Sequence, residues 1–209
     1  MNNLSNTSPA YVFISEIPDN IEIEEVFCKK RDEEITKTAN LTVKAEKYFV
    51  WRLLEYALSE SYGIDITDVE FSKNENGRWT SSDFNFSLSH SDGVAAVAVS
   101  DTSVGIDIEP ISTPRSDSFA RRILSSLEYE EFLSIPSENR EGYITKKWTQ
   151  KEAVFKSQNL AKFIPRKTEP NKEGTLKTDF LLIKNKKYIY SVFTAEKRDV
   201  KVFVGGFKI

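Results

Sequence analysis

The sequence predicts an α+β fold made of two similar halves in one chain, each with a small sheet and a long packing helix. Apolar residues recur every three or four positions over 43–62 and again over 143–158, as in a helix with one buried face. Short apolar or alternating runs, typical of strands, follow the first helix at 84–110 and the second at 180–207. We therefore expect two units, 1–103 and 104–209, although no letter-level repeat relates them.

The composition indicates a chain with a hydrophobic core and nearly balanced charge. Of 209 residues 39% are hydrophobic, and 29 basic against 32 acidic residues give a net charge of -3. This balance argues against a dedicated nucleic-acid binder, and no apolar run reaches the roughly 18 residues of a membrane span. The single cysteine, Cys28, excludes an intramolecular disulfide, and the first residues lack the features of a signal peptide. We expect a cytoplasmic protein without nucleic-acid or membrane partners.

Local patterns place the elements of the first half. An apolar run at 11–14 predicts an opening strand, and the densely charged stretch 22–37 predicts a surface helix. The helix at 43–62 is expected to end at Gly63, a residue suited to a helix C-terminus. A turn with Gly77 at positive φ precedes the strands.

The first half is expected to close with two strands joined by a tight turn at Asp92-Gly93. The second of them, 94–99, reads V-A-A-V-A-V and is typical of a strand covered on both faces. The first, 84–91, carries the only histidine, His90, between two serines. A lone histidine is more often a structural hydrogen-bonding group than a catalytic one, but the serine hydroxyls beside it also suit an anion site.

The segment 104–110, V-G-I-D-I-E-P, carries two carboxylates separated by one residue, Asp107 and Glu109. In a strand both point to one face, while Ile106 and Ile108 point to the other. Adjacent carboxylates repel unless a positive charge neutralises them, and Mg²⁺, which prefers oxygen ligands, would do so. An edge strand with a solvated acidic face is the alternative, and this segment alone leaves both open.

The rest of the second half is expected to add helices and a closing set of strands. A helix at 127–133 is predicted to be capped by Ser125 or Ser126, with Glu130 nearby. In the helix 143–158, Glu152 and Lys156 form an i,i+4 pair, which alone indicates an ordinary surface salt bridge. The other expected elements are a helix at 118–123 and strands at 180–183, 188–194 and 200–207.

Three segments together resemble the 4'-phosphopantetheinyl transferases of the monomeric, pseudodimeric class, the type that activates surfactin synthetase. They are S-L-S-H-S at 87–91, G-I-D-I-E at 105–109 and W-T-Q-K-E-A-V-F-K at 148–156. The resemblance implies transfer of the 4'-phosphopantetheine group of coenzyme A to a serine of an apo acyl or peptidyl carrier protein, with release of adenosine 3',5'-bisphosphate. It also implies a monomer with its active site between the halves, and Mg²⁺ as cofactor, with Mn²⁺ as an alternative.

The resemblance assigns roles to particular residues. It implies that Asp107, Glu109 and Glu152 hold the metal, and that Glu152 and Lys156 are catalytic. The residues implied to bind coenzyme A are Arg31, Lys47, Arg78, Ser89, His90, Lys151 and Lys156. The sequence departs from the family's pattern at Ser87, Trp79 and Tyr48, and these departures concern the coenzyme A contacts.

Coenzyme A would bind to the first half, and the metal and the carrier protein to the second. An acidic carrier protein is expected to dock on 157–172, a basic and loop-rich stretch, and on 119–124. Two other functions stay open: hydrolysis of coenzyme A without a carrier protein, and a coenzyme A- or carrier-binding module that has lost turnover. The presence of all three carboxylates together with Lys156 argues against the second.

Overall fold

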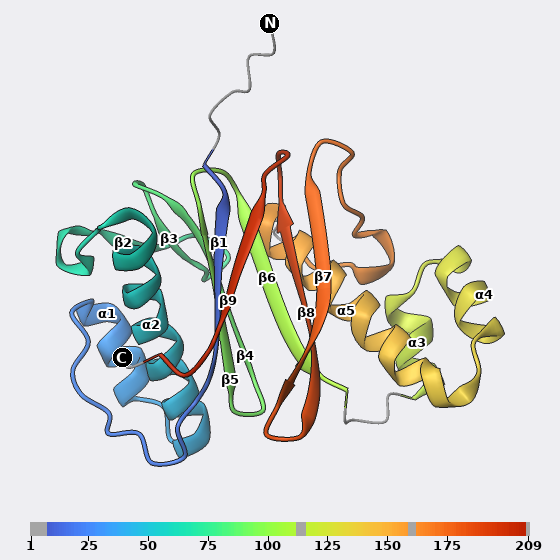
Figure 1. Ribbon diagram of the computed structural model, residues 1–209, viewed down its shortest axis with the longest axis horizontal. Helices are drawn as coiled ribbons and strands as arrows, with labels where there is room; N and C mark the ends of the chain where they lie inside the picture. The colour runs from blue at the N-terminus through green and yellow to red at the C-terminus, as the bar shows by residue number, and fades with distance from the viewer. Residues whose placement is uncertain (1–7, 112–115, 159–161, 208–209) are drawn as a thin grey trace, which may run out of the picture.

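The computed structural model describes residues 8–111, 116–158 and 162–207. Within these ranges the chain forms three sheets and five α-helices, so the predicted α+β class is confirmed. Figure 1 shows the strands of the two larger sheets side by side in the centre, with helices toward both ends of the molecule. Of the helices that are described, none combines the length and apolarity needed to cross a membrane.

The first sheet is built around β5 (Val94–Ser100), with strand order β4-β5-β1-β9. β4 (Asn85–Ser91) and β1 (Ala10–Glu16) run antiparallel to β5, and β9 (Val200–Val204) runs parallel to β1. Every residue of β5 is buried, as its apolar sequence predicts. One face packs against α2 (Leu41–Tyr62) and the other against the second sheet, so β5 is covered on both sides.

The second sheet has the order β6-β8-β7 and is antiparallel throughout. It consists of β6 (Val104–Pro110), β8 (Lys186–Thr194) and β7 (Thr175–Ile183). Ile106 and Ile108 of β6 point into a core shared with the first sheet. Strand alternation puts Asp107 and Glu109 on the opposite face, the one packed against α5 (Arg140–Gln158). This face therefore carries the acidic pair.

Helix α5 comes unusually close to β6 at Gly105. A Cβ atom on Gly105 would overlap the carbonyl oxygen of Ala153 and would lie 2.7 Å from the backbone nitrogen of Ser157. Only glycine fits here, because both of these atoms belong to the helix backbone. The close approach brings Glu152 and Lys156 of α5 next to the acidic strand.

Strands β4 and β6 lie side by side but belong to different sheets, and serine side chains connect them. The hydroxyl of Ser87 accepts a hydrogen bond from the Ile106 N–H (3.1 Å), and that of Ser89 accepts one from Ile108 N–H (3.3 Å). These hydroxyls satisfy backbone groups on the edge of β6 that no neighbouring strand pairs. We call this contact of Ser87, Ser89 and Ser91 with 106–109 the serine seam.

A helix was expected over 22–37, but it forms only in the second part of this segment, so the expectation was wrong for 22–28. The helix α1 covers only Lys29–Thr36. Ahead of it, the Val26 N–H donates to the Asp32 carboxylate (3.1 Å), and Val26 is buried. This bond holds 26–28 in a turn rather than in a helix, because the side chain of Asp32 takes the place of a helical carbonyl partner.

Other boundaries differ by a few residues. Helix α4 (Ser126–Ser134) is capped by Ser125 in a capping box with Glu128, not with Glu130. The strands β7 and β8 begin earlier than predicted, and β9 ends at Val204. The remaining elements are the short hairpin of β2 (Phe71–Lys73) and β3 (Trp79–Ser81), which was not predicted, α3 (Asp117–Ile123), and three 3₁₀ helices at Ile66–Asp68, Ser137–Asn139 and Pro165–Lys167.

The predicted turns are confirmed by their backbone angles. Asp92 and Gly93 both have positive φ, 48° and 79°, as a two-residue turn between β4 and β5 requires. Gly77 has φ 74°, and Gly63 ends α2 in the left-handed conformation.

Candidate active site

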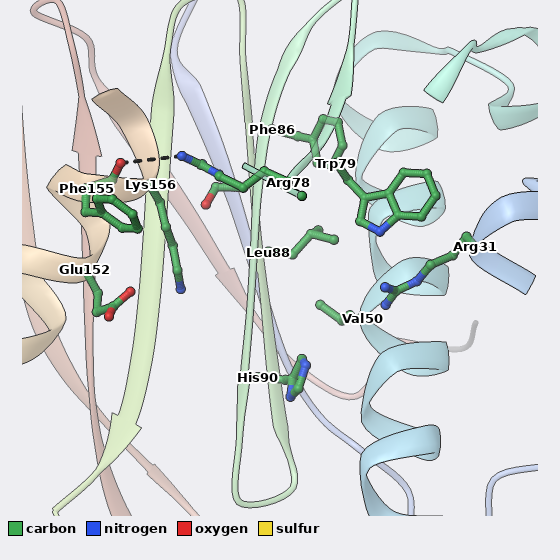
Figure 2. Close-up of a pocket in the computed structure, with 12 residues that line it drawn as sticks. Arg31, Val50, Arg78, Trp79, Phe86, Leu88, His90, Glu152, Phe155 and Lys156 are labelled. Carbon is green, nitrogen blue, oxygen red and sulfur yellow. Dashed lines mark hydrogen bonds between the residues drawn. The ribbon is translucent and has the colours of Figure 1, made fainter. Parts of the chain in front are cut away.

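A pocket of about 280 Å³ lies over β4, between α2 and α5. Figure 2 shows its side chains approaching from both sides: Glu152, Phe155 and Lys156 from α5, and Arg31 and Val50 from α1 and α2. The rest of the lining comes from the strands and the β2–β3 turn: Gly77, Arg78, Trp79, Phe86, Ser87, Leu88 and His90. Since Arg31, Arg78, His90 and Lys156 supply its basic groups, the pocket suits an anionic ligand.

The acidic pair of β6 is not solvated. Asp107 is only 5% exposed, and it accepts hydrogen bonds from Ser89 Oγ (2.8 Å) and Lys156 Nζ (2.8 Å) on the same oxygen, Oδ1. Glu109 is partly buried and accepts from Ser91 Oγ (3.3 Å). The alternative of an edge strand with a solvated acidic face is therefore excluded for Asp107.

Glu152 is electrostatically linked to this pair. Burial, together with the charges of Asp107 and Glu109, raises its pKa to about 7 against the opposing effects of Lys156 and Arg78. Lys156, for its part, forms its ion pair with Asp107 and also donates to the carbonyl of Ile106 (3.0 Å). The pair Glu152–Lys156 is thus part of a network with β6 rather than an isolated surface salt bridge.

The donor set of these side chains fits Mg²⁺ in its chemistry. Asp107, Glu109 and Glu152 offer carboxylate oxygens, and the second oxygen of Asp107, Oδ2, is buried with no hydrogen-bond partner among the described residues. The Lys156 ammonium is the cation nearest to Asp107. No group of three His, Cys, Asp or Glu side chains in the described part of the chain is close enough to hold an ion as the side chains stand. Binding would therefore require side-chain rearrangement around Asp107.

Two arginines frame the pocket. Arg78 follows the Gly77 turn, and its guanidinium donates to the Phe155 carbonyl of α5 (3.4 Å), the contact drawn in Figure 2. Arg31 is 5% exposed and donates to the Lys47 carbonyl (2.6 Å), while its Nε is buried without a partner among the described residues. Burial lowers the pKa of both guanidinium groups.

His90 lines the pocket, and its ring nitrogen Nδ1 lies 3.1 Å from the carboxylate of Glu46 on α2. Burial lowers the pKa of His90, and Arg31 and Lys156 lower it further, whereas Glu46 raises it. Glu46 had not been identified from the sequence. A signal was available, because Glu46 lies four residues before Val50 and seven before Leu53, on the otherwise buried stripe of α2.

Three of the residues expected to bind coenzyme A do not line the pocket: Ser89, whose hydroxyl is bonded to Asp107, and the two lysines Lys47 and Lys151. Lys47 lines a neighbouring hollow of about 550 Å³, which shares Trp79 with the pocket, and pairs with Glu34 (3.4 Å). Lys151 is 3% exposed on another side of α5, paired with Glu128 (2.9 Å) and Glu169 (3.4 Å). It does not line the pocket. Its placement gives no support to a cofactor role.

The segments expected to receive a carrier protein are only partly described. Residues 119–124 form most of α3 and the residue after it. Within 157–172, positions 159–161 lie outside the described residues. Both segments remain predictions.

Comparison with known proteins identifies the class. Residues 103–195 match the 4'-phosphopantetheinyl transferase superfamily. This segment contains Asp107, Glu109, Glu152 and Lys156. The resemblance drawn from the three motifs is confirmed: residues 103–195 belong to this superfamily.

Particular relatives match about half of the chain. The chain is 35% identical over 126 residues to the 4'-phosphopantetheinyl transferase psf-1 of Bacillus pumilus, covering 56% of this chain and 54% of that protein. It is 29% identical over 116 residues to the 4'-phosphopantetheinyl transferase Sfp of Bacillus subtilis strain 168, covering 54% and 51%. It is 34% identical over 114 residues to the 4'-phosphopantetheinyl transferase HetI of Nostoc sp. PCC 7120, covering 50% and 48%. The matched part spans about half the length of these relatives.

Proposed function

We propose that the protein transfers the 4'-phosphopantetheine group of coenzyme A to a serine of an acyl or peptidyl carrier protein, in the presence of Mg²⁺ or Mn²⁺. The observation that carries this proposal is one pocket lined by Glu152, Arg31, Arg78, His90 and Lys156, in which Lys156 is also joined to Asp107. Transfer from a diphosphate needs positioning and charge neutralisation more than covalent catalysis. The charges gathered here are those that such a transfer requires.

The three carboxylates, Asp107, Glu109 and Glu152, would hold the metal, which when bound neutralises charge on the diphosphate of coenzyme A. Lys156 lines the pocket, and its ammonium would bind a phosphate oxygen. Ser89 orients Asp107 through its hydrogen bond, so its effect on coenzyme A would be exerted through that carboxylate.

The acceptor serine requires a group that takes its proton. Glu152 suits this role, because its carboxylate lines the pocket and its pKa in the metal-free protein is raised to about 7, so that it can accept a proton near neutral pH. The serine oxygen forms a bond to the phosphorus that carries pantetheine, and the bond from that phosphorus to the bridging oxygen breaks. The proton goes to Glu152, and adenosine 3',5'-bisphosphate leaves with the bridging oxygen.

The proposal includes two similar halves with the active site between them. In the first half, β1-α2-β4-β5 forms a sheet in the order β4-β5-β1, and in the second, β6-α5-β7-β8 forms one in the order β7-β8-β6. In each half the helix after the first strand packs on the sheet, and neighbouring strands are antiparallel. This shared arrangement supports a pseudodimer with its boundary between β5 and β6, near 103/104. The exception is β9, which returns from the end of the chain to join the first sheet.

The carrier protein is proposed to dock beside the second half. Residues 119–124 contribute Arg121 and Arg122, and 157–172 contribute Arg166 and Lys167, which suit an acidic partner.

The deciding experiment is mass spectrometry of apo-carrier proteins incubated with the enzyme, coenzyme A and Mg²⁺. A gain of the phosphopantetheine mass, lost when EDTA removes the metal, is the expected result. Release of adenosine 3',5'-bisphosphate without a carrier protein would instead indicate a hydrolase, and binding of coenzyme A without turnover would indicate a binding module. His90→Ala should weaken coenzyme A binding, and an unchanged affinity would remove His90 from the site.

A further inference from the structure

Glu46, which contacts His90, has no role in the reaction proposed above. Glu46 belongs to α2 and His90 to β4, and the carboxylate Oε2 lies 3.1 Å from the ring nitrogen Nδ1. The Glu46 side chain is 12% exposed, so water competes little for this hydrogen bond. A carboxylate placed on the buried stripe of a helix is costly unless it is paired, and His90 is its partner.

This contact determines which nitrogen of His90 remains for a ligand. Imidazole has two nitrogens, and the partner of one sets where the proton of the neutral ring lies. With a carboxylate at Nδ1, the neutral ring carries its proton on Nδ1, and the protonated ring donates from both nitrogens. Only the protonated ring therefore has an N–H left at Nε2 for an anion in the pocket that His90 lines.

The cationic side chains near His90 oppose its protonation, whereas the Glu46 carboxylate favours it. Burial lowers the pKa of His90, and the cationic side chains of Arg31 on α1 and Lys156 on α5 lower it further. Glu46 raises the pKa, both through its charge and through its hydrogen bond. It is the acid that counteracts these effects on the His90 ring.

We infer that Glu46 is a positioning residue for the coenzyme A site, which orients the His90 ring through Nδ1 and favours its protonated form, in which Nε2–H donates to a phosphate group. The inference rests on the proposed function only for the identity of the ligand. The effect of Glu46 on His90 exists in the protein without coenzyme A and can be measured there.

His90 is the only histidine of the chain, so its imidazole signals in an NMR spectrum need no assignment. The ring is titrated in the ligand-free protein for wild type, Glu46→Gln and Glu46→Ala, with Glu60→Gln, an exposed position on the same helix, as the matched control. We expect a lower His90 pKa in both Glu46 variants and an unchanged one in the control. The nitrogen-15 shifts above the pKa should report the Nδ1–H tautomer in wild type and Glu46→Gln, and loss of that preference in Glu46→Ala.

A second arm measures coenzyme A affinity by calorimetry at pH 7.5. We expect about tenfold weaker binding to Glu46→Ala and unchanged binding to Glu60→Gln, because a charged hydrogen bond to phosphate is lost. An unchanged His90 pKa in both Glu46 variants, or an unchanged tautomer in Glu46→Ala, would overturn the inference. If Glu46→Ala fails to fold, the near-isosteric Glu46→Gln still decides it through the pKa. Absence of coenzyme A binding to wild type would contradict the proposed function while leaving the titration result to stand on its own.

Discussion

Gly105 of β6 lies so close to Ala153 of α5 that no Cβ atom fits between the strand and the carbonyl oxygen of the helix. This contact fixes how near α5 comes to the acidic strand. Lys156, three residues after Ala153, can therefore reach both Asp107 and the Ile106 carbonyl.

Gly105→Ala should lower the free energy of unfolding by about 2–3 kcal/mol, because the methyl group must displace helix backbone rather than a flexible side chain. Urea denaturation measures the loss. The matched control is Gly142→Ala in the same helix, where a Cβ meets nothing within 4 Å. That variant should be more stable by about 0.5–1 kcal/mol, since alanine favours a helix. Equal stabilities of the two variants would contradict the close packing at Gly105.

Glu152 should make stability depend on pH in the neutral range. Its pKa is about 7 in the folded protein, against roughly 4.3 in an unfolded chain. Between these values the folded state binds more protons, so this contribution is fully present below about pH 4.3 and is lost as pH rises through 7. The melting temperature of wild type relative to Glu152→Gln should therefore fall across this window. A constant difference between the two proteins would show that folding does not raise the pKa of Glu152.

The stabilisation by added Mg²⁺ should increase with pH, whereas the contribution of protonated Glu152 decreases. Binding requires ionised carboxylates, so the ion competes with the proton on Glu152 and should raise the melting temperature more at pH 8 than at pH 6. Glu152→Gln should remove most of this effect. If Mg²⁺ stabilised wild type and the variant equally at both pH values, Glu152 would not be a ligand.

Asp107→Asn should abolish carrier-protein labelling while the protein stays folded. The amide oxygen can still accept from Ser89, but the variant loses the negative charge that pairs with Lys156 and one of the two oxygens that could bind Mg²⁺. We expect transfer to fall by about a hundredfold or more, as for the loss of a group that stabilises charge in a transition state. Asp83→Asn, at an exposed position, serves as the control and should keep full activity. Full activity of Asp107→Asn would refute the metal assignment.

Ser87→Ala tests the serine seam. The variant leaves the Ile106 N–H without its acceptor at a buried position, which should cost about 1–3 kcal/mol in the free energy of unfolding. Ser59→Ala, on the exposed surface of α2, should change stability by no more than about 0.5 kcal/mol. A similar change in stability for both variants would mean that another group or a water molecule accepts the hydrogen bond of the Ile106 N–H.

Much of the fold could be predicted because the patterns are local. The run V-A-A-V-A-V predicts a strand buried on both faces, and the helix and turn boundaries follow from capping residues and glycines. The failure at 22–28 has a tertiary cause, since burial of Val26 and its bond to Asp32 decide that segment. The return of β9 to the first sheet has no local signal either, because strand pairing over this separation depends on the assembled fold.

The site was predictable where one helix face carries it. Glu152 and Lys156 are four residues apart and share a face, whereas five residues at 3.6 per turn set Lys151 about 140° away from Lys156. Helical spacing alone thus indicates that Lys151 cannot share the pocket with Lys156, as the ion pair of Lys151 with Glu128 bears out. Glu46 and His90 are 44 positions apart in the sequence, so their contact could not be predicted from residue spacing.

The serine seam also has a consequence for motion. Each sheet keeps its own ladder of backbone hydrogen bonds, while hydroxyl groups make the bonds from β4 to the Ile106 and Ile108 amides. The Ile106 and Ile108 amides can therefore lose these bonds by rotation of serine side chains, while both ladders and the core shared by the two sheets stay intact. Amide hydrogen exchange at Ile106 and Ile108 would then report this local opening, and a ligand that bridges α2 and α5 would slow it at these two positions first.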